Sequence, residues 1–167
     1  AIALLSKKKN LRILKLKKPI SKPIDKKMIK QITGGMLVQE IDTQIIESWS
    51  VPTNTPFSES KKELALFGIA AAKHTKSNAI VLVQEYEDRQ FRVLGMGAGQ
   101  PNRVDALKKL SVSKAIENLK EENPNIDDNE IKKIIGECIF VSEAFFPFAD
   151  SIDSANEMGA KYLVQPG

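Results

Sequence analysis

The sequence predicts an α/β domain with three αβα layers, in which a mixed sheet carries helices on both faces. Three observations favour this fold: a wholly apolar run at 79–83, typical of a strand covered on both faces, helix-periodic segments around it, and a strand–helix–strand order near the carboxyl end. The 167 residues are enough to bury one sizeable core. With 42% apolar and 28% charged residues, the composition argues against a collagen, a coiled coil or a disordered chain.

The first part of the chain is predicted to hold two strands and a loop. Lysines interleaved with leucine and isoleucine predict a strand at 10–17, and two prolines predict the turn at 19–23 that ends it. A glycine pair precedes the second strand, which the apolar residues 36–39 predict. The Pro, Ser and Thr content of residues 50–58 indicates a loop.

The central part predicts a helix, a hairpin and a second helix. A serine and a glutamate at capping-box spacing open the periodic apolar pattern of a helix at 60–74. The apolar run 79–83 turns back through a short polar stretch into 91–96, which predicts a hairpin. Pro101 marks the first turn of the second helix. The apolar stripe of that helix consists of Val104, Leu107, Ser111 and Ala115.

The last part predicts a parallel strand–helix–strand unit. An acidic, polar spacer at 120–129 leads to a buried strand at 139–141. A side chain at 150–151 is expected to cap the following helix, which Gly159 ends before a strand at 162–164. Two strands joined by a helix in this way lie parallel in one sheet.

Cysteine and histidine are too scarce for a disulfide or a zinc site. Cys138 and His74 are the single residues of their kinds, so we expect neither an internal disulfide nor a Cys/His zinc site, and a reducing, cytoplasmic setting. No apolar run approaches the roughly 18 residues of a transmembrane helix. The opening residues lack an initiator Met and are too few for a secretory signal, so we expect a piece of a longer chain.

Positive charge is concentrated at the amino end. Residues 1–30 hold 11 Lys or Arg and one acidic residue, whereas the rest of the chain holds 14 and 20. Such a segment attracts nucleic acid, with residues 7–30 as the contact. It has no aromatic residue for base stacking, however, so a strand with solvated lysines is the preferred interpretation and nucleic-acid binding is kept as an alternative.

Three stretches carry side chains suited to a binding or catalytic site. Each lies where a strand end meets a loop or a helix. Residues 73–78 form either a pocket wall, with Asn78 as donor and acceptor, or a helix C-terminus and a turn, which is the simpler interpretation. Residues 95–103 either let a ligand approach the backbone and a helix N-terminus or are turn glycines with a surface arginine. Residues 142–150 carry three phenylalanines and an aspartate, which favours a flat heteroaromatic ligand over core packing.

Together these stretches resemble a known enzyme family, the transformylase part of the bifunctional purine-biosynthesis enzyme AICAR formyltransferase/IMP cyclohydrolase. Gly-Gly-Met-Leu-Val-Gln at 34–39 and Trp49 before a Pro/Thr loop fit this family too. The four segments that carry the resemblance, in the family's order and spacing, are Lys-His-Thr-Lys-Ser-Asn-Ala (73–79), Gly-Met-Gly-Ala-Gly-Gln-Pro-Asn-Arg-Val (95–104), Glu-Ala-Phe-Phe-Pro-Phe-Ala-Asp (143–150) and Gln-Pro-Gly (165–167).

The resemblance implies a cytidine-deaminase-like fold, used twice in the transformylase. Residues 1–167 look like the second copy with the approach to it, in the C-terminal portion of that domain. The implied reaction belongs to de novo purine biosynthesis: the amine of AICAR takes a formyl group from 10-formyltetrahydrofolate. The zinc signature of the deaminases is absent, so no zinc is expected. The implied protein is a cytoplasmic homodimer whose partners are AICAR and folate, with no membrane contact and no nucleic acid.

Residue roles follow from the resemblance alone. It implies that Asn78 is catalytic and contacts the reacting amine and carboxamide, with Lys73 and Phe145 also at the substrate. The implied folate-binding residues are Arg103, Val104, Phe145, Pro147 and Asp150. A potassium ion is implied near three residues, Thr75, Ser77 and Glu143. Position 143 is a glutamate where the family more usually has aspartate.

Two departures from the family bear on activity. The family's catalytic lysine and histidine belong to a motif of the Lys-His-Val-Ser-Pro-Ala-Gly type that this chain lacks, and His74 lies in a different motif. The cyclohydrolase domain and the family's C-terminal continuation are missing as well. We therefore expect half of an active site and no activity from the chain alone. A catalytically incomplete folate- or nucleotide-binding module is the alternative.

Overall fold

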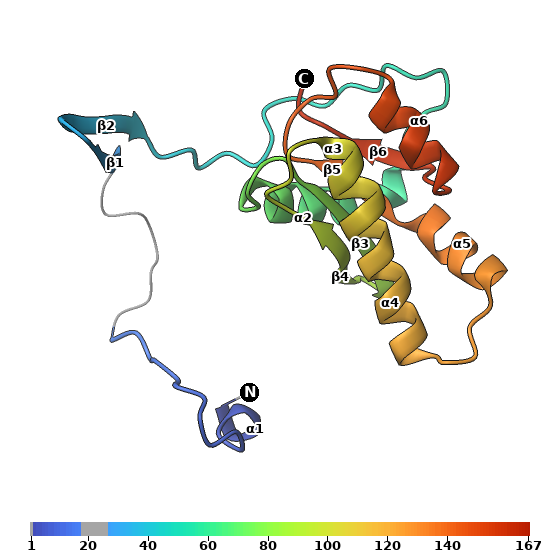
Figure 1. The fold of residues 1–167 in the computed structure, drawn as a ribbon, viewed down its shortest axis with the longest axis horizontal. Helices are drawn as coiled ribbons and strands as arrows, with labels where there is room; N and C mark the ends of the chain where they lie inside the picture. Colours follow the sequence, from blue (N-terminus) through green and yellow to red (C-terminus); the bar gives the residue numbers. More distant parts are fainter. Residues whose placement is uncertain (1, 18–26) are drawn as a thin grey trace. The chain divides into compact units, whose positions relative to one another are not determined.

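The computed structural model describes residues 2–17 and 27–167, which belong to two compact units, 1–43 and 44–167. The first unit holds a short helix, α1 (Ile2–Leu5), and an antiparallel pair, β1 (Lys27–Ile32) and β2 (Gly35–Glu40) (Figure 1). β2 confirms the strand expected at 36–39. β1 is an additional strand, and Gly34, with a φ of 82°, forms the turn between the two.

The strand expected at 10–17 is wrong. Residues 11–17 form no strand, and the Leu14 side chain is 93% exposed. The physical reason lies in the spacing, because a strand would put Leu11 and Ile13 on one face and Leu14 and Leu16 on the other. No single face can then be buried. The turn expected at 19–23 lies outside the described residues.

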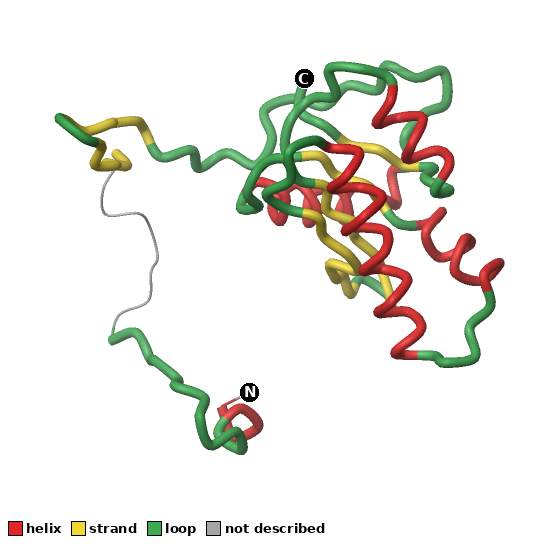
Figure 2. Tube along the Cα trace, viewed as in Figure 1, coloured by secondary structure: helices red, strands yellow, loops and turns green. Residues whose placement is uncertain are grey.

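The second unit is built on a four-stranded mixed sheet in the order β4-β3-β5-β6. Its strands are yellow in Figure 2. β3 (Ile80–Glu87) pairs antiparallel with β4 (Gln90–Gly97) and with β5 (Ile139–Ser142). β6 (Tyr162–Val164) runs parallel to β5. The expected hairpin and the expected parallel strand–helix–strand unit are therefore both confirmed.

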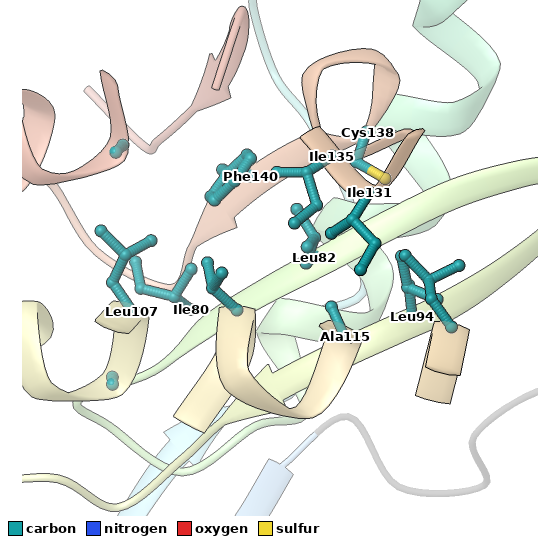
Figure 3. Packing of buried hydrophobic residues seen from close by; sticks show 13 residues of the cluster. Ile80, Leu82, Leu94, Leu107, Ala115, Ile131, Ile135, Cys138 and Phe140 are labelled. Atoms are coloured by element: carbon teal, nitrogen blue, oxygen red, sulfur yellow. The ribbon is translucent and has the colours of Figure 1, made fainter. Parts of the chain in front are cut away.

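Helices cover both faces of this sheet, as the sequence predicts. One face packs on α2 (Lys62–Lys73), which buries Leu64 and Ala65 against Val81 and Val141. The other face packs on the helices that follow β4, β5 and the 120–129 region. Figure 3 shows the larger cluster on this second face, which includes Ile80, Leu82, Leu94, Leu107, Ala115, Ile131, Ile135, Cys138 and Phe140.

A helical segment from 103 to 122 lies on that second face. It consists of α3 (Arg103–Asp105), a π-helical segment η2 (Ala106–Val112) and α4 (Ser113–Glu122). The helix begins two residues later than expected. Asn102 is its N-cap, because the Asn102 Oδ1 accepts a hydrogen bond from the Asp105 N–H at 2.8 Å, and Pro101 lies before the helix. The expected stripe is confirmed, with Val104 partly buried and three residues fully so: Leu107, Ser111 and Ala115.

Gly95 and Gly97 let this helical segment approach β4 closely. A Cβ at Gly95 would meet the Ser111 carbonyl oxygen at 2.0 Å, and one at Gly97 would meet the Ala106 carbonyl oxygen at 2.0 Å. Both glycines belong to β4, with Gly97 as its last residue, so Gly97 is not the turn glycine that one interpretation expects. Gly99, with a φ of 66°, is the residue that turns the chain.

In the second unit, sequence reasoning missed the helix α5 (Asp128–Glu137), part of which was expected to be spacer. The sequence does carry the signals that predict this helix. Asp127 and Glu130 form a reciprocal capping box, and Ile131 and Ile135 recur at the period of a helix and are buried.

Two expected caps do not form. Ser60 bonds to Ser58 in the 3-10 turn η1 (Glu59–Lys61), so α2 begins at Lys62 without a side-chain cap. The last helix, α6 (Asp150–Glu157), has Ala149 at its N-cap position, which makes Asp150 its first residue. Asp150 and Ser151 therefore lie within the helix and do not cap it.

Candidate functional site

Three segments distant in the sequence meet at the amino end of β3. The N–H of Ala79 donates to Oε2 of Glu143, just after β5, at 3.1 Å. The N–H of Gly99 donates to the Lys76 carbonyl oxygen at 2.7 Å. These bonds bring the residues before β3, the loop after β4 and the end of β5 together. We refer to Asn78, Arg103 and Glu143 as the strand-end site.

Asn78 fastens the loop after β4 to the start of β3. Its Nδ2 donates to the carbonyl oxygens of Gln100 and Pro101 at 3.0 and 3.1 Å. Its backbone N–H and C=O exchange two further bonds with Gln100, both at 3.2 Å. The side-chain donors are therefore used within the protein, while Oδ1 has no hydrogen-bond partner in residues 2–17 and 27–167. Asn78 keeps one acceptor for the N–H group of a ligand.

Arg103 and Glu143 form a largely buried ion pair beside Asn78. Arg103 Nη2 lies 3.1 Å from Glu143 Oε1, and the two side chains are 16% and 7% exposed. Arg103 Nε donates to Ser142 Oγ at 3.3 Å, and that hydroxyl donates to the Ala144 carbonyl oxygen at 2.6 Å. The pair joins the start of α3 to the end of β5, and the partly buried Val104 follows in α3. Sequence reasoning missed Ser142, a polar residue that ends a buried strand.

Residues 73–75 close the end of α2, as the simpler interpretation predicts. His74 is the C-cap residue, and its N–H donates to the Ala71 carbonyl oxygen at 3.3 Å. Lys73 Nζ donates to the Gln44 carbonyl oxygen at 2.6 Å, and Thr75 Oγ1 donates to that of Ala71 at 2.8 Å. These contacts hold the end of α2, and Thr75 Oγ1 also donates to Met96 Sδ of β4 at 3.5 Å.

The aromatic loop after β5 exposes two of its three phenylalanines. Phe145 and Phe148 are 58% and 73% exposed, whereas Phe146 packs partly against the core. The Phe146 N–H donates to Oε1 of Gln165 at 2.6 Å, which ties the loop to the chain beyond β6. Exposed aromatic rings of this kind offer a surface for a flat ligand.

Pro147 and Asp150 complete this loop, and both are exposed. Asp150 Oδ1 accepts the N–H of Ser151 at 2.7 Å. A carboxylate in the first turn of α6 is favoured by the helix dipole, and its second oxygen has no partner among the described residues. Asp150 can therefore accept hydrogen bonds from a ligand without giving up its local bond.

Other reactive groups of the described chain point to no second centre. No three His, Cys, Asp or Glu side chains of the described ranges gather as a metal site. Cys138 is fully buried, and burial raises the pKa of its thiol to about 12, so it stays protonated at neutral pH. No helix among the described residues has the length and apolarity needed to cross a membrane.

The cavities described in the structure lie away from the strand-end site. Two cavities, of about 310 and 420 Å³, are lined by residues of other regions, the first by Arg92 and Asn118 among others and the second by Lys61 and Glu137 among others. Small-molecule sites usually bury most of their ligand. Neither of these two cavities would enclose a ligand at Asn78 and Arg103.

Comparison with known proteins identifies one family. The model of the AICARFT/IMPCHase bienzyme family matches residues 1–114, a range that includes the basic amino-terminal segment. The chain is 41% identical, over its whole length, to the bifunctional purine biosynthesis protein PurH of Petrotoga mobilis, and 38% and 39% identical to the PurH proteins of Lactobacillus acidophilus and Prochlorococcus marinus. It spans 28–29% of the length of these relatives.

Proposed function

The chain belongs to the AICARFT/IMPCHase bienzyme family, and from this premise we propose that it supplies part of an AICAR formyltransferase site within a longer polypeptide. That site transfers a formyl group from 10-formyltetrahydrofolate to AICAR in purine biosynthesis. The observation that carries the proposal is the strand-end site, where Asn78 presents a free acceptor beside the buried Arg103–Glu143 pair.

The proposed fold is cytidine-deaminase-like, with residues 1–167 as the second copy and the approach to it in the C-terminal portion of the transformylase domain. The mixed four-stranded sheet between helical layers supports this assignment. The chain spans 28% of the length of the Petrotoga mobilis relative, which supports completion of the site by the rest of a longer chain or by a second copy in a homodimer. The reaction proceeds in the cytoplasm.

In the proposed reaction, Asn78 orients the attacking amine. The exocyclic nitrogen of AICAR forms a bond to the formyl carbon, the bond from that carbon to N10 of the folate breaks, and the proton of the amine passes to N10. Asn78 Oδ1 accepts an N–H of the amine and aims its lone pair at the carbon. So weak an amine also needs a general base. The family's lysine–histidine motif is absent from this sequence and His74 lies in a different motif, so we place the base outside this chain.

The folate is proposed to lie on Phe145 and Pro147, with Asp150 accepting hydrogen bonds from its pterin amino group. Arg103 is proposed to donate a hydrogen bond to the folate, since its Nη1 has no partner among the described residues. Lys73 and Phe145 were expected at the AICAR side. The bond from Lys73 to Gln44 favours a structural role for that lysine, so we retain only Phe145.

The isolated chain of residues 1–167 is expected to show no formyl transfer, because the general base and the rest of the site are missing. The test compares it with a chimera in which residues 1–167 replace the matching segment of the Petrotoga mobilis relative, a segment that covers all of this chain. Formation of formyl-AICAR is the measurement. Robust turnover by the isolated chain would contradict this account of what is missing.

Asp150→Asn in the chimera is expected to weaken folate binding about ten-fold, since a hydrogen bond to a charged group contributes about 1.5–3 kcal/mol. Equilibrium titration with 10-formyltetrahydrofolate measures the effect. Asp153→Asn is the matched control, because Asp153 is an exposed aspartate of the same helix. If the two variants bind folate with equal affinity, Asp150 has no role in folate binding and serves only in its bond to Ser151.

Two alternatives predict other outcomes. A catalytically incomplete binding module would bind folate in the chimera without transferring the formyl group. A nucleic-acid binder would retain RNA with a steep salt dependence through residues 7–30. The family match begins at residue 1, which favours the basic segment as part of the enzyme.

A further inference from the structure

We infer that the Arg103 guanidinium, and not a potassium ion, balances the charge of the buried Glu143 carboxylate. The family resemblance implies a potassium ion near Thr75, Ser77 and Glu143, and the geometry at Glu143 disagrees with it. The inference concerns charge balance alone, so it stands or falls separately from formyl transfer.

Both oxygens of Glu143 already have donors from the protein. Oε1 lies 3.1 Å from Arg103 Nη2, and Oε2 accepts the Ala79 N–H at 3.1 Å. Ser142 Oγ accepts from Arg103 Nε and so fixes the plane of the guanidinium. A buried carboxylate needs a counter-charge and hydrogen bonds, and these groups provide both.

A potassium ion against Glu143 would lie next to the guanidinium. With side chains only 16% and 7% exposed, water screens the repulsion between the two cations poorly. The other two implied residues bring no charge to offset this repulsion. Thr75 donates its hydroxyl to the Ala71 carbonyl oxygen, and Ser77 is exposed. The donor set therefore does not fit a monovalent metal ion.

The length of the glutamate explains the difference from the family's usual aspartate. Glu143 leaves the end of β5 and reaches both the start of β3 and the guanidinium on α3. An aspartate is shorter by one methylene, so from the same backbone position its carboxylate would reach less far toward either donor. The longer side chain of Glu143 thus allows Arg103 to neutralise the site.

Two measurements on the full chain of residues 1–167 test the inference. Thallium-205 NMR with added thallium(I), a potassium substitute, is expected to detect no bound ion that potassium displaces. Thermal unfolding in potassium, sodium or choline chloride at equal ionic strength is expected to give midpoints within about 1 °C, since no site links the ion to folding.

Removing the arginine tests the other half of the inference. Arg103→Met is expected to lower the unfolding midpoint in all three salts by several degrees, because it leaves a buried carboxylate without its counter-charge. Arg89→Met is the matched control, since Arg89 pairs with Glu63 at 3.0 Å but both side chains are exposed. Equal midpoints for the two variants would overturn the inference. Should Arg103→Met fail to fold, the thallium experiment decides, and a bound, potassium-displaceable ion in the wild-type chain would overturn it.

Discussion

Asn78→Ala in the chimera is expected to lower the single-turnover rate of formyl transfer by about 10²–10³, the usual effect of removing a positioned polar group from a transition state. The reason is geometric. The Nδ2 donors of Asn78 are held by the carbonyl oxygens of Gln100 and Pro101, so Oδ1 is fixed in direction before substrate arrives. Alanine removes the acceptor and leaves the amine of AICAR without orientation. Rapid-quench measurement of formyl-AICAR checks the rate.

The same substitution also removes two structural hydrogen bonds, and its stability effect needs a control. Each bond contributes about 0.5–1.5 kcal/mol, so a lower unfolding midpoint is expected as well. Asn118→Ala provides the comparison, because Asn118 Nδ2 donates to the Leu94 carbonyl oxygen at 2.8 Å away from the strand-end site. Asn118→Ala should lose stability and keep its rate. If Asn78→Ala behaves in the same way, Asn78 only fastens the loop.

Gly97→Ala is expected to destabilise the second unit by about 3 kcal/mol or more, at the upper end of overpacking substitutions. The added Cβ would lie 2.0 Å from the Ala106 carbonyl oxygen, and the obstacle is backbone, which cannot rotate away like a side chain. Either η2 moves off the sheet or β4 bends. Because the same helical segment begins at Arg103, the substitution is also expected to disturb the strand-end site.

Chemical denaturation of the chain measures this loss. Gly136→Ala is the matched control, since its added Cβ would meet nothing closer than 3.3 Å and it lies within α5. That variant should change stability by less than about 1 kcal/mol. A Gly97→Ala chain as stable as Gly136→Ala would show that the helical segment tolerates displacement from β4.

The second unit's sheet and most of its helices could be predicted because their signals are local. The apolar run at 79–83 and the periodic residues of α2 and η2 each report one buried face. The strand expected at 10–17 failed on the same local rule, since its apolar residues change faces. The role of Gly95 and Gly97 could not be predicted, because it depends on how closely a helix packs and not on the glycines' neighbours in sequence.

For the candidate site, the sequence could single out segments but not the contacts between them. Asn78, Arg103 and Glu143 come from three segments, and sequence offers no measure of which atoms meet. A potassium ion near position 143 was implied only by the family pattern, whereas the structure pairs Glu143 with Arg103. Lys73, near Asn78 in sequence, is held instead by the Gln44 carbonyl oxygen. Side-chain reach and backbone packing decide these contacts.

Formyl transfer by the chimera is the most direct test of the central claim, that this chain supplies half of an AICAR formyltransferase site. Purified chimera is mixed with AICAR and 10-formyltetrahydrofolate, and formyl-AICAR is measured beside the unmodified Petrotoga mobilis relative. The account expects turnover by the chimera, and none by residues 1–167 alone. A folded chimera that binds AICAR and folate and transfers no formyl group, while the relative does so under the same conditions, would contradict it.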